Sequence, residues 1–337
     1  MKKKNKKILN SIKNEFLNNK FYYLFMLFIL LINVIKLDYY IFSPGSLISL
    51  DGRIKVENAT KEEGSFNLTY VTARNGTIMN VILSYIIPTW DKVPLSSLRV
   101  EGESNKEANK RGQIELKQTS YDAIVAAFDA AGLEYNVKSL DIAVEYIYEE
   151  ANTDLKVGDI IKKINDVEVK DLDELHNEIA KYKKDDEIKI SIIRNNKEKE
   201  VTAVLTESDG RVVIGVLIGV LKDVETSPKV EYVFKDSESG GSRGLMCALE
   251  IYNRITEKDL TKGRKIAGTG VIYSDGTVGT IDGIKYKLSG AVKKGASIFI
   301  VPKENYEEAN KLKDKFNYNI KIISADNLKQ VIEELEK

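Results

Sequence analysis

From residue 207 to the C-terminus, strand-like and helix-like segments alternate along the chain. Apolar strand patterns lie at Val230–Phe234 and Ser297–Val301, and helix patterns lie at Leu245–Ile255 and Ile284–Lys294. This alternation predicts an α/β (α+β) domain over 207–337, in which helices pack on a sheet. With 337 residues, the whole chain is long enough for two or three domains.

Residues 133–206 carry a different, β-rich pattern. A strand at Ile142–Tyr148 is followed by Leu155-Lys-Val-Gly-Asp-Ile-Ile, an amphipathic helix at Leu172–Tyr182 and a hairpin around Asn195-Asn196. This order resembles a PDZ domain, which implies capture of extended peptides by strand addition to a sheet edge. No Gly-Leu-Gly-Phe-like carboxylate loop precedes Ile142, so a packing domain without a ligand is the alternative.

The region 43–132 predicts an α+β spacer. Patterns rich in β-branched and aromatic residues lie at Ser65–Ala73 and Thr77–Pro88, and both are typical of strands. Ser120–Ala131 is a helix pattern that begins with an N-capping serine and ends at Gly132. No motif with a chemical role stands out, so we expect this region to serve as a spacer and packing surface.

The N-terminal segment predicts a membrane anchor. Residues 1–20 form a basic tail with seven lysines and one glutamate, and the apolar run Phe21–Ile35 follows. We expect a single transmembrane helix within 21–42, with the tail in the cytoplasm and everything after Tyr40 outside it, because lysines favour the inner side. A cleaved signal peptide is the alternative, but no small-residue cleavage site follows the run.

The residue inventory excludes several kinds of chemistry. His176 is the only histidine and Cys247 the only cysteine, so a zinc site of His and Cys ligands cannot form within one chain. The formal net charge is zero, which argues against a nucleic-acid partner. A phosphate-binding Gly-x-x-x-x-Gly-Lys-Ser/Thr loop is absent, so no ATPase module is present. We expect no metal and no cofactor, and lysine is the strongest remaining candidate for a base.

A glycine-rich turn, Gly240-Gly-Ser-Arg-Gly244, directly precedes the Leu245–Ile255 helix pattern. Backbone N–H groups at such a turn and the positive end of the helix dipole suit an oxyanion that develops during acyl transfer. Ser242 is therefore a candidate nucleophile. The alternative is an ordinary loop with an N-capping serine. Asp236 and Glu238, just upstream, could line a substrate cleft or only solvate the loop.

Lys287 is the candidate base. On the helix pattern 284–294 it flanks the apolar stripe, and its neighbours Gly283 and Gly290 leave room for another element to press against it. A lysine that accepts a proton must be neutral at working pH, and burial lowers its pKa. Periodicity alone does not distinguish Lys287 from Lys285, and a solvated lysine is the alternative.

Several motifs in this region resemble the proteolytic domain of Lon-type peptidases. They are Gly-Gly-Ser-Arg-Gly-Leu (240–245), Gly-Thr-Gly-Val-Ile (268–272), Asp-Gly-Thr-Val-Gly-Thr-Ile-Asp-Gly-Ile-Lys-Tyr-Lys (275–287) and Gly-Ala-Ser-Ile-Phe-Ile-Val-Pro (295–302). The resemblance implies a Ser–Lys dyad of Ser242 and Lys287, with Thr269 orienting the lysine. Gly241 and Gly290 depart from the family, where proline and alanine are common.

The whole chain resembles a narrower group, the membrane-anchored, PDZ-containing Lon-like proteases that lack an ATPase. Ser-Pro-Gly (43–45), Glu-Gly-Ser-Phe (63–66) and Ala-Ile-Val-Ala-Ala (123–127) carry this resemblance. It implies an ATP-independent serine endopeptidase that acts on extracytoplasmic peptides or membrane-tethered proteins, and a homo-oligomer. A catalytically silent, membrane-tethered PDZ scaffold is the alternative. Cys247 is expected in the core and His176 on the surface.

Overall fold

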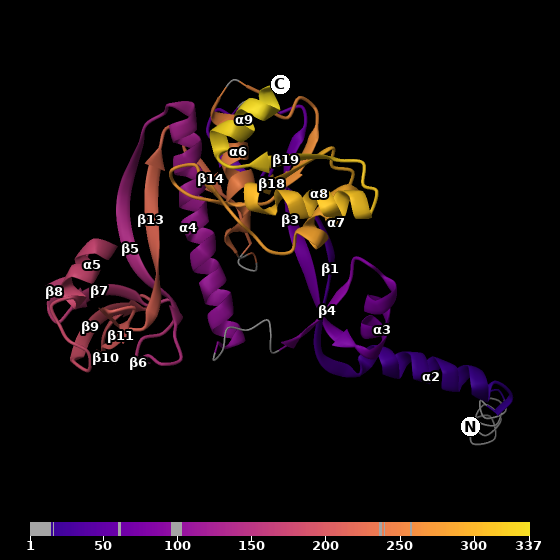
Figure 1. Ribbon diagram of the computed structural model, residues 1–337, viewed down its shortest axis with the longest axis horizontal. Helices are drawn as coiled ribbons and strands as arrows, with labels where there is room; N and C mark the ends of the chain where they lie inside the picture. Colours follow the sequence, from indigo (N-terminus) through magenta and orange to yellow (C-terminus); the bar gives the residue numbers. More distant parts are fainter. Residues whose placement is uncertain are drawn as a thin grey trace, which may run out of the picture. The chain divides into compact units, whose positions relative to one another are not determined.

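A computed structural model of the chain describes residues 15, 17–59, 62–95, 103–235, 238, 240–256 and 258–337. The chain divides into two compact units. The small unit comprises Met1–Pro44 and Val71–Leu98, and the large unit comprises Gly45–Tyr70 and Arg99–Lys337. Figure 1 labels most of the elements of both.

A mostly parallel sheet forms the centre of the C-terminal part of the large unit. Its strand order is β19-β18-β15-β3-β1, and β3, β15, β18 and β19 run parallel. The strands are β1 (Lys36–Ser49), β3 (Ser65–Thr77), β15 (Lys265–Gly268), β18 (Ile298–Pro302) and β19 (Lys321–Ala325). Region 43–132, expected to be a spacer, therefore contributes strands to the same sheet as the C-terminal region.

Helices cover both faces of this sheet. The alternation of side chains along β15 and β18 explains this arrangement, because successive residues of a strand point to opposite faces. Ile266 and Ile298 belong to one core cluster, with residues of α4 (Asn105–Ala131), α6 (Gly244–Ile255) and α9 (Leu328–Glu336). Ala267 and Phe299 belong to the cluster formed with α7 (Ile284–Lys293) and α8 (Tyr306–Lys315). The result is the α/β layering expected over 207–337.

Two small antiparallel pairs flank this sheet. The hairpin of β16 (Val271–Ile272) and β17 (Val278–Gly279) confirms the turn predicted at Asp275-Gly276. Gly276 adopts a φ of +83°, which glycine allows without a steric penalty. The other pair joins β2 (Ile54–Val56) to β14 (Val230–Tyr232).

A second sheet, of order β13-β5-β7-β9-β10-β6, accounts for the β-rich middle of the chain. Its strands are β5 (Tyr135–Ile147), β6 (Asn152–Thr153), β7 (Ile160–Ile164), β9 (Glu187–Arg194), β10 (Lys197–Val204) and β13 (Val216–Thr226), with β8 (Val167–Glu168) paired to β7. β11 (Thr206–Ser208) and β12 (Arg211–Val213) form a separate hairpin. Helix α5 (Leu172–Ile179) closes the core through Leu175 and Ile179.

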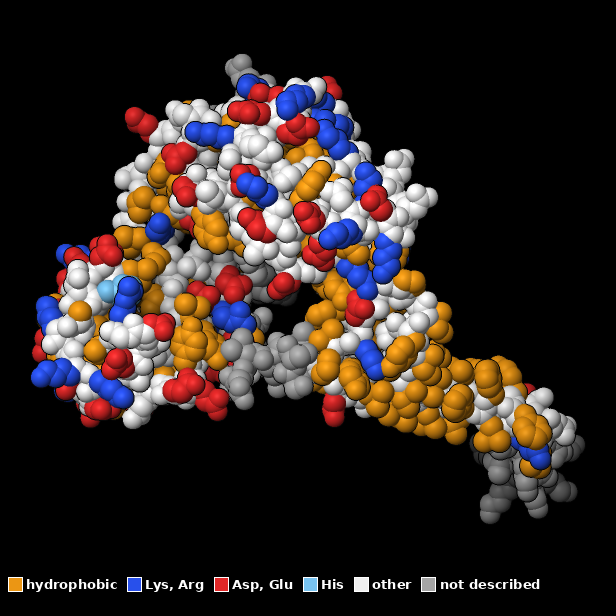
Figure 2. Space-filling view, viewed as in Figure 1, with side chains coloured by type: hydrophobic (Ala, Val, Ile, Leu, Met, Phe, Trp, Pro, Cys, Tyr) orange, Lys and Arg blue, Asp and Glu red, His pale blue; other side chains and the backbone are white. Residues whose placement is uncertain are grey.

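In the small unit, α2 (Lys20–Val34) is followed by β1 and not by a continued helix. The predicted transmembrane helix within 21–42 is therefore not supported, since 36–42 lie in a strand and α2 has 15 residues, or about 22 Å at 1.5 Å per residue. No helix in the described ranges is long and apolar enough to cross a membrane. Figure 2 shows hydrophobic side chains exposed along α2.

Helix α3 (Ile78–Ile86) replaces the strand predicted at Thr77–Pro88. The strand prediction relied on the content of β-branched residues. The signal that identifies a helix here is an N-capping residue at its start. Thr77 has extended backbone angles and its side chain accepts a hydrogen bond from the Asn80 N–H, as in a typical helix start. β4 (Asp91–Pro94) follows α3 and pairs antiparallel with β1 through Tyr40 and Val93.

Candidate active site

Ser242 lies in a single turn of 3₁₀ helix, η2 (Gly241–Arg243), that leads directly into α6. Gly240 enters this turn with a φ of +92°, a conformation that side chains with a Cβ rarely adopt. A Cβ at Gly241 would meet no atom nearer than Val271 Cγ2, at 3.9 Å. The glycine at 240 is therefore required by the backbone, whereas the glycine at 241 is not required by crowding.

The carbonyl oxygen of Ser242 is held by the segment that follows β15. It accepts hydrogen bonds from the Gly270 N–H at 2.9 Å and from Thr269 Oγ1 at 3.1 Å. Thr269 is itself fixed, because its N–H donates to the Ile300 carbonyl in β18. The backbone of the turn is thereby bonded to the segment at the carboxyl end of β15. The position of Ser242 therefore depends on the register of β15 and β18 in the central sheet.

Lys287 reaches Ser242 from the first turn of α7. Gly283, with a φ of +79°, precedes this helix. The Lys287 Nζ lies 3.2 Å from Ser242 Oγ and 3.0 Å from Thr269 Oγ1. The Thr269 hydroxyl hydrogen is committed to the Ser242 carbonyl, so its oxygen accepts an N–H from Lys287. This hydrogen bond leaves the lone pair of a neutral amine free to face the Ser242 hydroxyl.

Burial keeps the Lys287 amine away from water. Its side chain is on the most covered side of α7, and the residue is only 6% exposed. Desolvation lowers the pKa of Lys287 from 10.5 to about 8, although the Asp282 carboxylate acts in the opposite direction. Gly290, one helical turn further, lies against the backbone of Gly45, where a Cβ would be 3.2 Å from the Gly45 carbonyl oxygen. Gly290, one of the small residues predicted to admit another element, does so.

The turn offers few free donors for an oxyanion. The Gly240 N–H donates to the Gly112 carbonyl, and the Gly244 N–H donates to the Gly241 carbonyl. Both groups are thus already used within the protein. The Ser242 N–H is the candidate donor that remains. Hydrogen bonds fix the carbonyl groups on both sides of it, those of Gly241 and Ser242.

Neighbouring charges are neutralised within the loop. Glu238 forms ion pairs with Arg53 and Arg243, and the Arg243 guanidinium stacks 4.7 Å from the centre of the Phe234 ring. These contacts assign Glu238 to the support of the loop. Asp236, the other acidic candidate, lies outside the described residues.

The remaining titratable candidates lie away from the dyad. Cys247 is buried in the core cluster, as expected, and burial raises the pKa of its thiol to about 12. A thiol in this state is protonated and a poor nucleophile. His176 is on the exposed side of α5, as expected. In the described part of the chain, no group of three or more His, Cys, Asp or Glu side chains could hold a metal ion.

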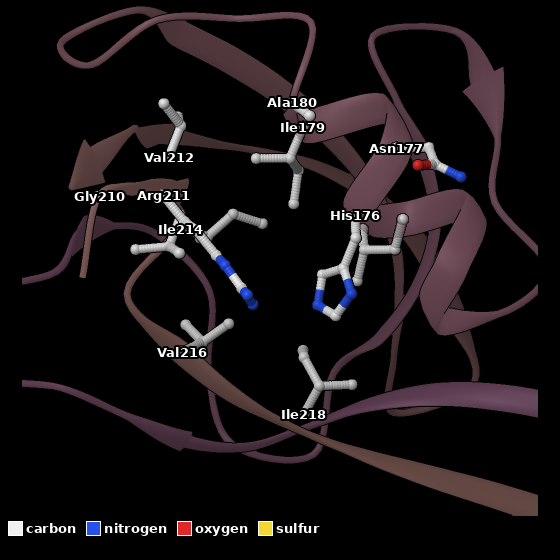
Figure 3. A pocket seen from close by; sticks show the side chains of 12 residues that line it. His176, Asn177, Ile179, Ala180, Gly210, Arg211, Val212, Ile214, Val216 and Ile218 are labelled. Atoms are coloured by element: carbon white, nitrogen blue, oxygen red, sulfur yellow. The ribbon is translucent and has the colours of Figure 1, made fainter. Parts of the chain in front are cut away.

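A cavity of about 580 Å³ lies between α5 and the start of β13. Figure 3 shows the side chains of His176 and Arg211 reaching into it from opposite sides. Its walls are otherwise mainly aliphatic, with Ile179, Val216 and Ile218 among them. Arg211 forms no ion pair with any residue that the structure describes. A cavity with an apolar floor and a free guanidinium suits an apolar group next to a carboxylate.

The structure identifies an open edge of the sheet. β5 is paired on both sides, with β13 and with β7, so it cannot accept a further strand. β13 is the terminal strand of the sheet. The turn Val213-Ile-Gly-Val216 leads into β13, with Gly215 at a φ of +84°. This turn does not precede Ile142 but follows the β-rich domain in sequence, where an apolar–Gly–apolar pattern before a strand marks it.

Family comparisons agree with this division of the chain. Residues 132–205 match the PDZ domain family, and residues 233–336 match the C-terminal proteolytic domain of Lon protease. The chain thus combines a PDZ domain with a Lon-type serine protease domain of mixed α/β structure. β13 and its preceding turn lie beyond the PDZ match, and α4, β1 and β3 lie outside both matches.

Two curated relatives are Lon protease 2 of Borreliella burgdorferi and Lon protease 2 of Herpetosiphon aurantiacus. The first is 29% identical over 116 residues, which are 34% of this chain and 14% of that protein. The second is 25% identical over 95 residues, which are 28% of this chain and 11% of that protein. The matched part of the chain therefore spans only a small fraction of the length of these relatives.

Among solved structures, the chain is similar to PDZ domains of SdrC-like proteins. That of Listeria monocytogenes is 23% identical and covers 23% of this chain and 85% of that chain, with a TM-score of 0.21. That of Listeria innocua is 28% identical and covers 23% of this chain and 92% of that chain, with a TM-score of 0.22.

Proposed function

We propose that this protein is an ATP-independent serine endopeptidase that uses a dyad of Ser242 and Lys287. The observation that carries the proposal is the 3.2 Å separation between Ser242 Oγ and a Lys287 Nζ that is almost completely buried. A hydroxyl and an amine at hydrogen-bond distance can exchange a proton directly, and burial favours the neutral amine that this exchange requires.

The reaction then proceeds in two halves. Neutral Lys287 removes the proton from Ser242 Oγ as the oxygen attacks the scissile carbonyl carbon, and the carbonyl oxygen becomes an oxyanion facing the Ser242 N–H. Collapse of this intermediate breaks the C–N bond, and the lysine ammonium returns the proton to the leaving amine. A water molecule, deprotonated by the same lysine, then hydrolyses the ester to release the second product and the free serine.

Thr269 is a positioning residue in this mechanism. Its hydroxyl donates to the Ser242 carbonyl and accepts from Lys287, so it keeps the amine aimed at the nucleophile. Gly241 is placed next to the nucleophile by the same turn, and the proposal assigns it a supporting role through the backbone.

We propose that extended protein segments are the substrates and that the PDZ domain captures them. The supporting features are the free edge of β13 and the adjacent cavity with Arg211. A peptide added to β13 would extend the sheet, while an apolar side chain near its carboxylate would fill the cavity. Because no phosphate-binding loop is present in the sequence, the substrates are segments that need no unfolding by ATP hydrolysis.

We further propose that the protein acts outside the cytoplasm at a cell membrane, as a homo-oligomer. The exposed apolar side chains of α2 and the lysines of residues 1–20 support membrane contact. The oligomer is inferred from the resemblance to Lon-type proteases alone.

Labelling with a fluorophosphonate probe tests the dyad. Ser242→Ala and Lys287→Ala should each abolish covalent labelling, because one lacks the nucleophile and the other the base. Lys285→Ala is the matched control, since it removes a lysine from the same helix two residues away. A silent scaffold is the alternative function, which the PDZ cavity favours independently of the dyad. Unlabelled native protein would favour the silent scaffold, whereas normal labelling of Lys287→Ala would show that Lys287 is not the base.

A further inference from the structure

Helix α4 contacts the nucleophile turn at two points. Thr119 Oγ1 donates a hydrogen bond to the Gly241 carbonyl oxygen at 3.0 Å, and the Gly112 carbonyl accepts one from the Gly240 N–H at 3.0 Å. Residues 112 and 119 are seven apart, so they lie on the same face of the helix, two turns from each other. Thr119 is thus a side chain of α4 that binds this turn directly.

Thr119 is buried and closely fitted. It is 3% exposed, so its hydroxyl does not compete with bulk water for the Gly241 carbonyl. A Cβ added to Gly244 would lie 2.4 Å from Thr119 Oγ1, which shows that the hydroxyl occupies space left by the glycine at the start of α6. The Gly240-x-x-x-Gly244 spacing thus serves the approach of α4 as well as the turn itself.

The hydrogen bond from Thr119 to the Gly241 carbonyl also determines the direction of the Ser242 N–H. The Gly241 C=O and the Ser242 N–H belong to the same planar, trans peptide unit, so they point in opposite directions. Fixing the oxygen with Thr119 and with the Gly244 N–H therefore fixes the direction of the Ser242 N–H. The peptide unit after Ser242 is fixed separately, by Thr269 and Gly270.

We propose that Thr119 is a positioning residue that aims the Ser242 N–H at the oxyanion. The inference rests on the proposed protease function. Thr119 acts through the backbone and touches no reacting atom. It lies on a helix outside the matched proteolytic domain, so the catalytic geometry of this chain depends on a residue more than a hundred positions upstream.

Kinetics of full-length variants test this role. Removing one direct oxyanion donor costs about 10²–10³ in kcat, so loss of a residue that only aims the donor should cost roughly tenfold or more. We expect Thr119→Val to lower kcat for a short fluorogenic peptide by that factor with little change in KM. Thr119→Ser, which keeps the hydroxyl, should restore activity to within about threefold of the native rate.

Two further measurements separate positioning from stability. A peptide aldehyde forms a tetrahedral adduct with the serine, and its affinity should fall by the same factor as kcat/KM in Thr119→Val. Peptide binding in a Ser242→Ala background should not change when Thr119→Val is added. Thr256→Val is the matched control, because Thr256 Oγ1 donates to the Tyr252 carbonyl at the far end of α6. Its kcat should remain near the native value.

The outcomes are distinct. If the native protein has no peptidase activity and is not acylated, the proposed function fails. If the native protein is active but Thr119→Val stays within twofold of it, or Thr119→Ser is as impaired as Thr119→Val, the positioning role is wrong. Should Thr119→Val not fold, Thr119→Ala supplies the same comparison without added bulk at Cγ.

Discussion

At the residue scale, the most consequential group is the amine of Lys287. The burial that makes it a useful base also lowers the free energy of unfolding at neutral pH. The unfolded chain carries this lysine as an ammonium with a pKa near 10.4. Burial lowers the pKa of Lys287 in the folded protein to about 8. Between these two values the unfolded state binds more protons than the folded state, so stability rises with pH over that interval, and the full penalty applies below pH 8.

Activity and stability should therefore respond oppositely to loss of this amine. Lys287→Met keeps the length of the side chain and removes the charge, so we expect it to raise the free energy of unfolding at pH 7 by up to roughly 3 kcal/mol. The same variant should be inactive. Urea denaturation at pH 7 and pH 10 checks this, since the gain should shrink at the higher pH. A variant less stable than the native protein at pH 7 would contradict the burial argument.

The pH dependence of acylation follows from the same group. The rate of fluorophosphonate labelling should rise with pH along a single titration with a midpoint near 8, because only the neutral amine accepts the serine proton. Lys285→Ala should leave the midpoint unchanged. A profile that is flat between pH 6 and 9, or that rises only above pH 10, would show that Lys287 does not act as the base.

At this scale, the pair could be proposed from a family resemblance but not from the physical pattern of the sequence. The resemblance to Lon motifs singled out Ser242 and Lys287, whereas helix periodicity left Lys287 and Lys285 equivalent. What separates the two lysines is burial, since Lys287 is buried and Lys285 is partly exposed, and the position of Thr269 after β15. Thr119 was missed for a similar reason, because no local pattern reveals which carbonyl a buried threonine will meet.

At the element scale, the close contact between β1 and α7 brings two glycines together at the helix that carries Lys287. Gly45 and Gly290 meet backbone to backbone, but the two glycines differ in their surroundings. A Cβ at Gly45 would lie 2.1 Å from the Tyr70 carbonyl oxygen, which is far inside van der Waals contact. A Cβ at Gly290 would lie 3.2 Å from the Gly45 carbonyl oxygen, which a shift of a few tenths of an ångström relieves.

The same substitution at these two positions should have different effects. Gly45→Ala should displace β1 from β3, destabilise the protein by several kcal/mol and reduce labelling, in line with other cases of overpacking. Gly290→Ala should leave the melting temperature within a few degrees of the native value, because alanine favours the helix by about 1 kcal/mol and offsets the crowding. Thermal melts and labelling of both variants check this. Equal losses in the two would contradict the geometry.

Element types were predictable where the local signals agreed. The β16–β17 hairpin follows from Asp275-Gly276, and α7 follows from its apolar stripe and the glycine at its end. The small unit shows the opposite case. Thr77–Pro88 has the composition of a strand, yet the N-cap at Thr77 starts α3. The open edge at β13 depends on its pairing with β5, which joins residues from Val216 and Ile147 to Thr226 and Tyr135 that are far apart in sequence, and periodicity does not report such a pairing.

At the scale of the whole molecule, the PDZ domain is an insertion within the protease fold. The chain enters it at the start of β5 and leaves at the end of β13, and these ends meet, since Tyr135 pairs with Thr226. Strand β3 and helix α4 precede the insertion, while β14, α6 and the rest of the sheet follow it. Adjacent ends are typical of domains that can be removed without disturbing their host.

Replacing residues 136–225 with a two-residue Asn-Gly turn should therefore leave the protease fold intact. We expect the shortened protein to be labelled by a fluorophosphonate, although somewhat more slowly, because α4 loses its packing against β5 and β13 and the hydrogen bond from Lys110 to the Val157 carbonyl. Its kcat/KM for casein, an unstructured protein, should fall about tenfold relative to that for a short peptide. Arg211→Ala in the full chain is the matched test of the cavity. Unchanged casein cleavage in both would exclude a role for the PDZ domain in capture.

The pairing of β3 with β15 has a consequence for the nascent chain. Asn67 in β3 donates to the Ile266 carbonyl in β15, 199 positions later, and the backbone of Gly45 lies against Gly290 of α7. The residues up to Gly290 must therefore have left the ribosome before these contacts can form. Under the proposed mechanism, a nascent chain that ends before α7 lacks Lys287 and cannot activate Ser242, so peptidase activity requires synthesis beyond that helix.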